Sequence, residues 1–217
     1  MTHHNVDFSK QIETDIDNSF NVRDELKSLT VEELQAVHLR DRLPFGVCAL
    51  NTTGDLNLGV MLRTASILGA SDFIIFGRRK YDRRSSVGAQ NYIKVHRVDG
   101  LNADMSFNLY TFWETMTALN YFPVFVEQLP IELRALGVYG PTLQTISWPK
   151  IIERYGQGHH PCLVFGNEST GIPLTLISSG HPIVEIPQRG VLRSLNVSAS
   201  MAMVTWDLVK YLTTNNK

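Results

Sequence analysis

The stretch FGVCALNTTGDLNLGVMLRTASILGASDFIIF, residues 45–76, decides the fold class of this chain. It begins with the apolar run FGVCAL (45–50), continues through a helical pattern over residues 57–68, and ends with a second apolar run, FIIF (73–76). Nearly continuous apolar strands that alternate with helices are typical of a parallel sheet, because such strands are buried on both faces. The sequence therefore predicts an α/β fold, with helices flanking a parallel sheet.

The same alternation continues toward the C-terminus. Further strands are predicted at PVFVEQ (123–128), CLVF (162–165) and PIVEI (182–186), and further helices at about 106–119, near 147–155, shortly after CLVF and at 196–213. Ligands of such sheets bind beside the carboxyl ends of the strands. The loops that follow residues 50, 165 and 186 are therefore the candidate site.

The front of the chain has a different character. Residues 1–20 are polar and rich in turn-forming side chains, whereas residues 22–42 carry one or two amphipathic helical patterns, with Thr30 and Glu33 at the spacing of a capping box. We expect an N-terminal extension over 1–44, partly disordered and then helical, followed by one domain over 45–217. No motif indicates what the extension does.

Composition excludes several classes of protein. The net charge of −1 over 217 residues means that any nucleic-acid site must be a local basic patch. Cys48 and Cys162 lie in apolar runs, which predicts buried reduced thiols rather than a disulfide framework or a zinc site. No metal site is expected, no apolar run approaches 18 residues, and the polar start has no signal-peptide core, so we expect a cytoplasmic protein.

One unusual pattern opens the helix predicted over 57–68. Asn57 can cap the helix, Gly59 lets another group approach its first turn, and Arg63 follows about one turn later among apolar neighbours. A capped helix whose arginine extends its head to water explains these residues equally well.

Two further patterns follow predicted strands. In LVFGNESTGIP (163–173) the triplet Gly166–Asn167–Glu168 comes directly after a strand, and no Lys-Ser/Thr pair completes a P-loop. In IPQRGVLRSLN (186–196) a loop with Pro187 and Gly190 leads into Ser194 and Asn196 at the start of the last helix. Helix capping uses one of these two side chains and leaves the other unexplained. For the Gly166–Asn167–Glu168 pattern, an ordinary turn after a strand is an equally good explanation.

A basic segment lies in GRRKYDRRSSVGAQ (77–90). Its five cations are Arg78, Arg79, Lys80, Arg83 and Arg84. Such a cluster binds phosphates without reading sequence, so these side chains are candidate RNA-binding residues. The alternative is a solvated basic loop.

Three of these stretches, in order and over about residues 45–212, resemble the SpoU (TrmH-like) branch of the SPOUT RNA methyltransferases. Asn57, Gly59 and Arg63 are similar to its first motif, Gly166–Asn167–Glu168 with Gly171 to its second, and the residues from Ile186 to Val197 to its third. The third motif is most similar to that of tRNA guanosine 2′-O-methyltransferases of eukaryotic type. Gln188 stands where the family often has methionine.

The resemblance implies a deep trefoil knot near the C-terminus, a homodimer with sites at the subunit interface, and S-adenosylmethionine bound by the knot loops. It implies that the cofactor-binding residues are Val126, Gly166, Asn167, Ile186, Gly190 and Leu195. It implies that the catalytic residues are Asn57, Arg63, Glu168, Ser194 and Asn196.

The expected activity is methyl transfer to a ribose 2′-hydroxyl of RNA, most plausibly tRNA. A guanidinium holds its proton in proteins and is a poor base. We therefore expect Arg63 to anchor a substrate phosphate and to stabilise charge on the 2′-oxygen, although a role as base stays open. The alternatives are a ribosomal RNA substrate, an inactive RNA-binding partner of a methyltransferase, and a Rossmann-type enzyme, for which the first strand lacks a Gly-rich turn. The motifs do not name the nucleotide or say whether a partner protein is needed.

Overall fold

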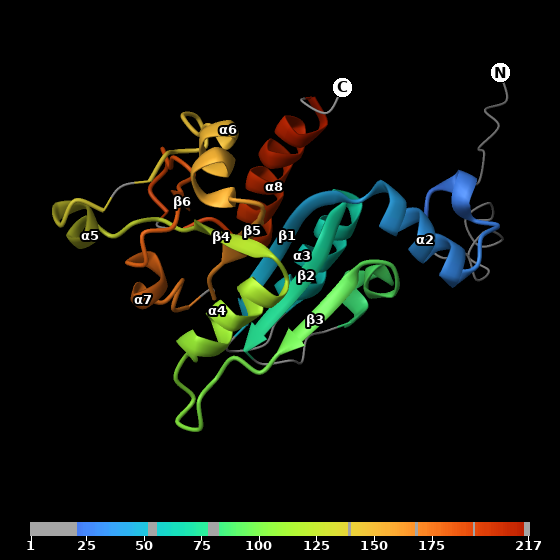
Figure 1. The fold of residues 1–217 in the computed structure, drawn as a ribbon, viewed down its shortest axis with the longest axis horizontal. Helices are drawn as coiled ribbons and strands as arrows, with labels where there is room; N and C mark the ends of the chain where they lie inside the picture. Colours follow the sequence, from blue (N-terminus) through green and yellow to red (C-terminus); the bar gives the residue numbers. More distant parts are fainter. Residues whose placement is uncertain are drawn as a thin grey trace, which may run out of the picture.

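A six-stranded sheet forms the centre of the computed structural model (Figure 1), with strand order β3-β2-β1-β5-β4-β6. All pairings between these strands are parallel, which confirms the predicted α/β sheet. The structure describes residues 21–51, 56–77, 83–138, 140–167, 169–192 and 194–214. The part of the extension predicted to be disordered, residues 1–20, lies outside the described residues.

The strands are β1 (Leu43–Asn51), β2 (Ala70–Gly77), β3 (Lys94–Val98), β4 (Tyr121–Val126), β5 (His160–Phe165) and β6 (Ile183–Val184). Every predicted strand is present. β6 is shorter than its apolar run, and β1 begins before the predicted domain start at residue 45. The sequence did not reveal β3, because an edge strand is only partly buried and KVHRV lacks a continuous apolar run.

The helices are α2 (Val31–Asp41), α3 (Leu56–Ile67), α4 (Leu109–Ala118), α5 (Ile131–Ala135), α6 (Trp148–Ile151), α7 (Leu174–Ile177) and α8 (Val197–Thr214). Short helical turns are η1 (Asp24–Leu26), η2 (Arg83–Ser86), η3 (Ala89–Asn91) and the π-helical η4 (Ile152–Gly156), which continues α6. The capping box is confirmed, since the Thr30 hydroxyl accepts from the Glu33 amide at 3.3 Å while the Glu33 carboxylate accepts from the Thr30 amide at 2.8 Å.

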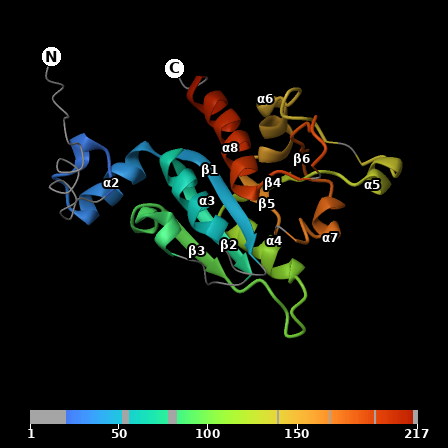
Figure 2. The ribbon, with the colours of Figure 1, turned by 180° about the vertical axis from the view of Figure 1, so that it is seen from behind.

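Helices cover both faces of the sheet, as the two opposite views show (Figures 1 and 2). On one face, α3, α6 and α8 pack side chains such as Leu62, Trp148 and Leu208 into one apolar cluster. On the other face, α4 and α7 contribute Phe112 and Leu176 to a second cluster. α2 lies at one end of the molecule and α5 at the opposite end in both views.

Buried and half-buried polar groups meet near the amino ends of the strands. The Asp72 carboxylate bonds the His96 ring at 2.6 Å and accepts the Tyr121 hydroxyl at 2.5 Å. Tyr121 lies on β4 and Asp72 on β2, so the phenol crosses β5 and β1 to reach its partner. Gly46 on β1 makes this possible, because a Cβ there would lie 2.9 Å from the tyrosine ring. A small residue on one strand therefore lets a hydrogen bond join two others.

The thiols of Cys48 and Cys162 are free and buried, as predicted. Burial raises the pKa of both thiols far above the usual range of cysteine, so both stay protonated. Within the described ranges, no helix is long and apolar enough to cross a membrane.

The hydrogen bonds of Asp72 make the free energy of unfolding depend on pH in the acidic range. Burial raises the pKa of Asp72, but the hydrogen bonds from His96 and Tyr121 outweigh it, so the folded-state pKa lies below the usual value. Its contribution to stability is therefore present above pH ~4 and lost as the pH falls through the lower folded-state value. We expect the difference in unfolding free energy between wild type and Asp72→Asn to shrink as the pH falls below ~4. Urea denaturation over this range measures it, and a difference that is the same at every pH would contradict this assignment.

Candidate functional site

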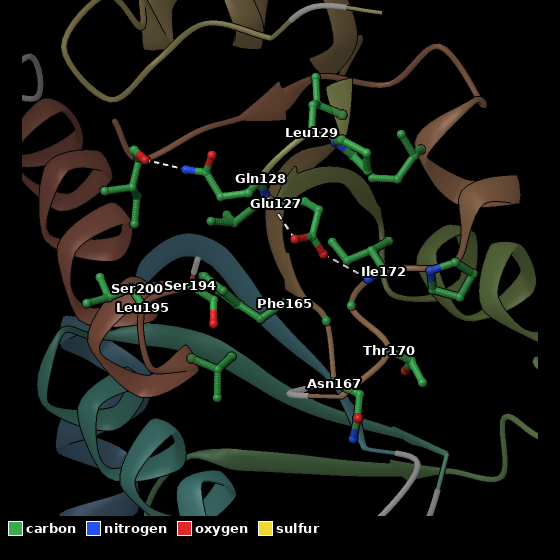
Figure 3. Close-up of a pocket in the computed structure, with 18 of the residues that line it drawn as sticks. Glu127, Gln128, Leu129, Phe165, Asn167, Thr170, Ile172, Ser194, Leu195 and Ser200 are labelled. Atoms are coloured by element: carbon green, nitrogen blue, oxygen red, sulfur yellow. Dashed lines mark hydrogen bonds between the residues drawn. The ribbon is translucent and has the colours of Figure 1, made fainter. Parts of the chain in front are cut away.

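A cavity of about 840 Å³ lies beside the carboxyl ends of β4, β5 and β6 (Figure 3). Its walls come from the segment after Val126, the turn after Phe165, and the loop between Ile186 and α8. The structure thus places a cavity beside the loops that follow residues 165 and 186, two of the three loops in which the site is predicted. The loop after β1 lies largely outside the described residues.

The first wall is a tight turn at Gly166 and Asn167. The backbone amide and carbonyl of Asn167 pair with those of Gly171, at 3.2 and 2.8 Å, and the buried Asn167 side chain accepts from the Ser169 amide at 2.9 Å. A Cβ on Gly166 would lie 2.6 Å from the Ile172 nitrogen. Only glycine lets the strand end pass this closely under the turn.

A carboxylate fixes the turn from the side. The Glu127 side chain accepts from the backbone amides of Gln128 and Ile172, both at 2.9 Å, and lies at the centre of the cavity wall in Figure 3. Among the described residues that line the cavity, Glu127 is the only one with a charged side chain. A cavity with one carboxylate and no described cation favours a positively charged or neutral ligand over a phosphate.

Two further side chains link the strand ends, and sequence reasoning missed both. The Gln128 amide donates to the carbonyl of Ile186 and so ties the end of β4 to the loop after β6. The buried carboxylate of Glu185 accepts from the Leu129 amide at 3.0 Å and from the Arg134 guanidinium on α5. An acid inside the apolar run IVEI was the one sequence signal that could have revealed Glu185.

The third wall contains Ser194, Leu195 and Asn196. Asn196 caps α8, because its side-chain oxygen accepts from the Ser198 amide at 2.9 Å. Its side-chain nitrogen donates to Asn57 at 3.3 Å, which joins the first and third motifs. The prediction that Asn57 caps its helix is wrong: α3 begins at Leu56, so Asn57 lies inside the first turn and its side chain turns toward Asn196.

Arg63 is exposed on α3 and does not line the cavity of its own chain. It lies one turn beyond Gly59, on the same face of the helix. A Cβ on Gly59 would lie 2.8 Å from the Ser86 nitrogen, so this face packs against η2 and brings Arg63 toward the basic segment. Arg84, at the end of that segment, is exposed.

The structure brings together seven of the predicted catalytic and cofactor-binding residues around this cavity. Those that line it are Val126, Gly166, Asn167, Ile186, Ser194, Leu195 and Asn196. Gly190 does not line it. Glu168, Arg78, Arg79 and Lys80 and the side chain of Arg83 lie outside the described residues. Over the part of the chain that is described, no three His, Cys, Asp or Glu side chains are grouped to hold a metal ion.

A parallel sheet covered on both faces, with a cavity at its strand ends, defines an α/β protein of the kind that binds ligands at this edge of the sheet. The chain belongs to the SpoU rRNA Methylase family, whose model matches residues 44–206. The match spans the sheet, the cavity and all three motifs.

Known relatives share parts of this chain. It is 28% identical over 158 residues to the Mus musculus tRNA (guanosine(18)-2′-O)-methyltransferase TARBP1; the match covers 71% of this chain and only 8% of that much longer protein. The A. aeolicus TrmH/SpoU tRNA modifying enzyme is similar with a TM-score of 0.62 and 16% identity, over 86% of this chain and 84% of the other. AviRb from Streptomyces viridochromogenes, solved with AdoMet, is similar with a TM-score of 0.56 and 22% identity, over 81% of this chain and 60% of the other. These structural likenesses show a shared fold.

Two glycines predicted to hold the same ligand differ in their surroundings. Gly166→Ala should lower the unfolding free energy by about 1–3 kcal/mol, because the new methyl meets backbone rather than a flexible side chain. Gly190→Ala is the matched control, since nothing lies within 4 Å of its Cβ position, and should change stability by less than ~0.5 kcal/mol. Chemical denaturation measures both, and equal effects would contradict the crowded turn described above.

Proposed function

We propose that this chain transfers a methyl group from S-adenosylmethionine to a ribose 2′-hydroxyl of RNA, and that the RNA is a tRNA. The observation that carries this proposal is the convergence of the second and third motifs on one cavity, with Asn57 of the first motif bonded to its rim. Family membership and the AdoMet-bound relative support the same reading. Because the chain spans 8% of TARBP1, that protein's activity and substrate reach this chain only as a proposal.

The cavity fits the proposed cofactor in size and in charge. Its volume of about 840 Å³ lies in the range of small-molecule sites. Val126, Ile186 and Leu195 would hold the adenosine with backbone groups and apolar surface, and the turn at Gly166 and Asn167 would close around it. The Glu127 carboxylate suits a ligand that carries a sulfonium and an ammonium. The cofactor supplies an activated methyl group when bound.

The remaining work falls to side chains. The side chains of the site would hold the ribose 2′-oxygen in line with the activated methyl group that the bound cofactor would supply, and the hydroxyl proton would pass to solvent or to Arg63. Alignment of that oxygen supplies much of the acceleration, and we assign it to Ser194 and Asn196, with Asn57 and Glu168 in support. Arg63 would hold a substrate phosphate and stabilise charge on the 2′-oxygen. A hydroxyl that DNA lacks makes the reaction selective for RNA.

We also propose that the active unit is a homodimer. Arg63 does not line its own cavity, and exposed apolar side chains occur on α8, at Met203 and Trp206, and in the loop before it, at Val191 and Leu192. A second copy that covered these side chains would remove them from water and could present its own Arg63 to the site. The basic segment, Arg78 to Arg84, would flank the bound RNA. The family resemblance further supports a C-terminal trefoil knot, which stays a prediction, as does the cytoplasmic location.

Loss of Arg63 tests the activity itself. Arg63→Ala should lower methyl transfer from labelled S-adenosylmethionine to an unmodified tRNA transcript by about 100-fold or more, because a stabilising charge is lost at the reacting oxygen. Arg97→Ala, an exposed arginine on the edge strand β3, is the matched control and should keep full activity. Nucleoside analysis should identify a 2′-O-methyl product. If wild type binds no S-adenosylmethionine, the proposed methyltransferase activity is wrong. If it transfers methyl groups only to ribosomal RNA, the activity stands and the proposed tRNA substrate is wrong.

Mixing two inactive variants tests the shared site. Leu195→Lys should block binding of S-adenosylmethionine, because it adds a positive charge to the wall of a cavity that would hold a positively charged cofactor. Equilibrium dialysis checks this loss of binding. Mixed with Arg63→Ala, it should restore about a quarter of wild-type activity, because half of the dimers then carry one complete site. Each variant alone should stay inactive. An inactive mixture, with sedimentation showing that subunits exchange, would mean that Arg63 serves its own chain.

A further inference from the structure

A second cavity, of about 460 Å³, lies outside the methyl-transfer site. It is formed between α6 with η4 on one side and the segment from α7 to β6 on the other, and α6 lies beside β6 in both views of the fold (Figures 1 and 2). The buried side chain of Ile177 on α7 lines both cavities. None of the three motifs contributes to this second cavity.

Two cations stand on its rim. Lys150 and Arg154 are four residues apart, which places them on one face of the continuous α6–η4 helical segment. Both are exposed, and the Arg154 guanidinium lies 5.3 Å from the centre of the Tyr155 ring, which restricts its position. No carboxylate occurs among the described residues that line this cavity. The charge of the cavity is therefore positive, in contrast with the first cavity.

The opposite wall carries a neutral hydrogen-bond acceptor. Burial lowers the pKa of His181 by more than a hydrogen bond to the Ser179 backbone raises it, so the ring is neutral near pH 7. The Ser179 hydroxyl donates to the Leu176 carbonyl at 2.6 Å, so at 3.1 Å it can only accept from His181 Nδ1–H. Nε2 therefore carries the free lone pair. Trp113 and Tyr155, with ring centres 4.7 and 6.4 Å away, hold the imidazole in place.

We propose that this cavity binds one nucleotide of the RNA substrate, with Lys150 and Arg154 on a phosphate and His181 accepting from a ribose hydroxyl. The proposal rests on the proposed function, because it requires RNA as the substrate. Two exposed cations attract an isolated phosphate only weakly in salt. A nucleotide of an RNA already held at the methyl-transfer site arrives at high effective concentration, and the same two contacts then suffice. The observations thus favour RNA over a free small anion.

The salt dependence of RNA affinity tests the proposal. The double variant Lys150→Ala/Arg154→Ala should weaken binding of an unmodified tRNA transcript and reduce the slope of log affinity against log salt by between 1 and about 2. Filter binding with the full chain measures both, and equilibrium dialysis should give unchanged S-adenosylmethionine binding. Lys94→Ala/Arg97→Ala is the matched control, because it removes the same two charge types from two exposed positions of β3. Arg154→Lys, which keeps the charge, should retain the wild-type slope.

Each other result has a definite meaning. If the double variant shows the same salt slope as wild type, the proposed nucleotide site is wrong. If wild type still transfers methyl groups in that case, the proposed enzymatic function is unaffected. An equal loss in the β3 control also overturns it, since any surface charge would then act alike. Tight binding of inorganic phosphate or adenosine monophosphate, abolished in the double variant while tRNA affinity is unchanged, would mean a small-anion site instead. Failure of wild type to bind or methylate any RNA would refute the proposed function, and this proposal with it.

Discussion

The rest of the site depends on the parallel pairing of β4 between β5 and β6. Val126 is in register with Phe165 on one side and with Val184 on the other, so the three strands end at one level. Segments far apart in the sequence then leave the sheet side by side, and the space among them becomes the cavity. A parallel sheet allows this because all of its carboxyl ends lie along one edge.

Side chains at the end of β4 turn this proximity into a fixed shape. Glu127 holds the turn after β5 through the Ile172 amide, and Gln128 holds the loop after β6 through the Ile186 carbonyl. Loops tend to be more mobile than the strands that they connect. Here two adjacent residues directly after β4 fasten the backbones of both neighbouring loops, so ligand binding orders less chain than loops of this length would otherwise require.

Local pattern predicted the sheet, and tertiary contacts explain what it missed. Apolar runs identify β1, β2, β4 and β5 because buried parallel strands are apolar on both faces, whereas β3 lies half-exposed at the edge and has no such run. Motif spacing identified residues in two walls of the cavity, at Gly166 and Asn167 and from Ser194 to Asn196. It could not distinguish Gly166 from Gly190, since backbone crowding exists only in the folded chain. Nor could it reveal the hydrogen bonds of Glu127 and Gln128, whose partners lie 45 and 58 residues away.

The two hydrogen bonds of the Asn196 side chain have a consequence for how this protein can evolve. Its oxygen caps α8, and its nitrogen reaches Asn57 on α3, so one amide serves the start of a core helix and the rim of the cavity together. A serine at this position is too short to span both helices, and an aspartate would keep the cap and lose only the donor to Asn57. Asparagine therefore satisfies both demands at once, and most substitutions here would loosen the start of α8 and the rim of the cavity together.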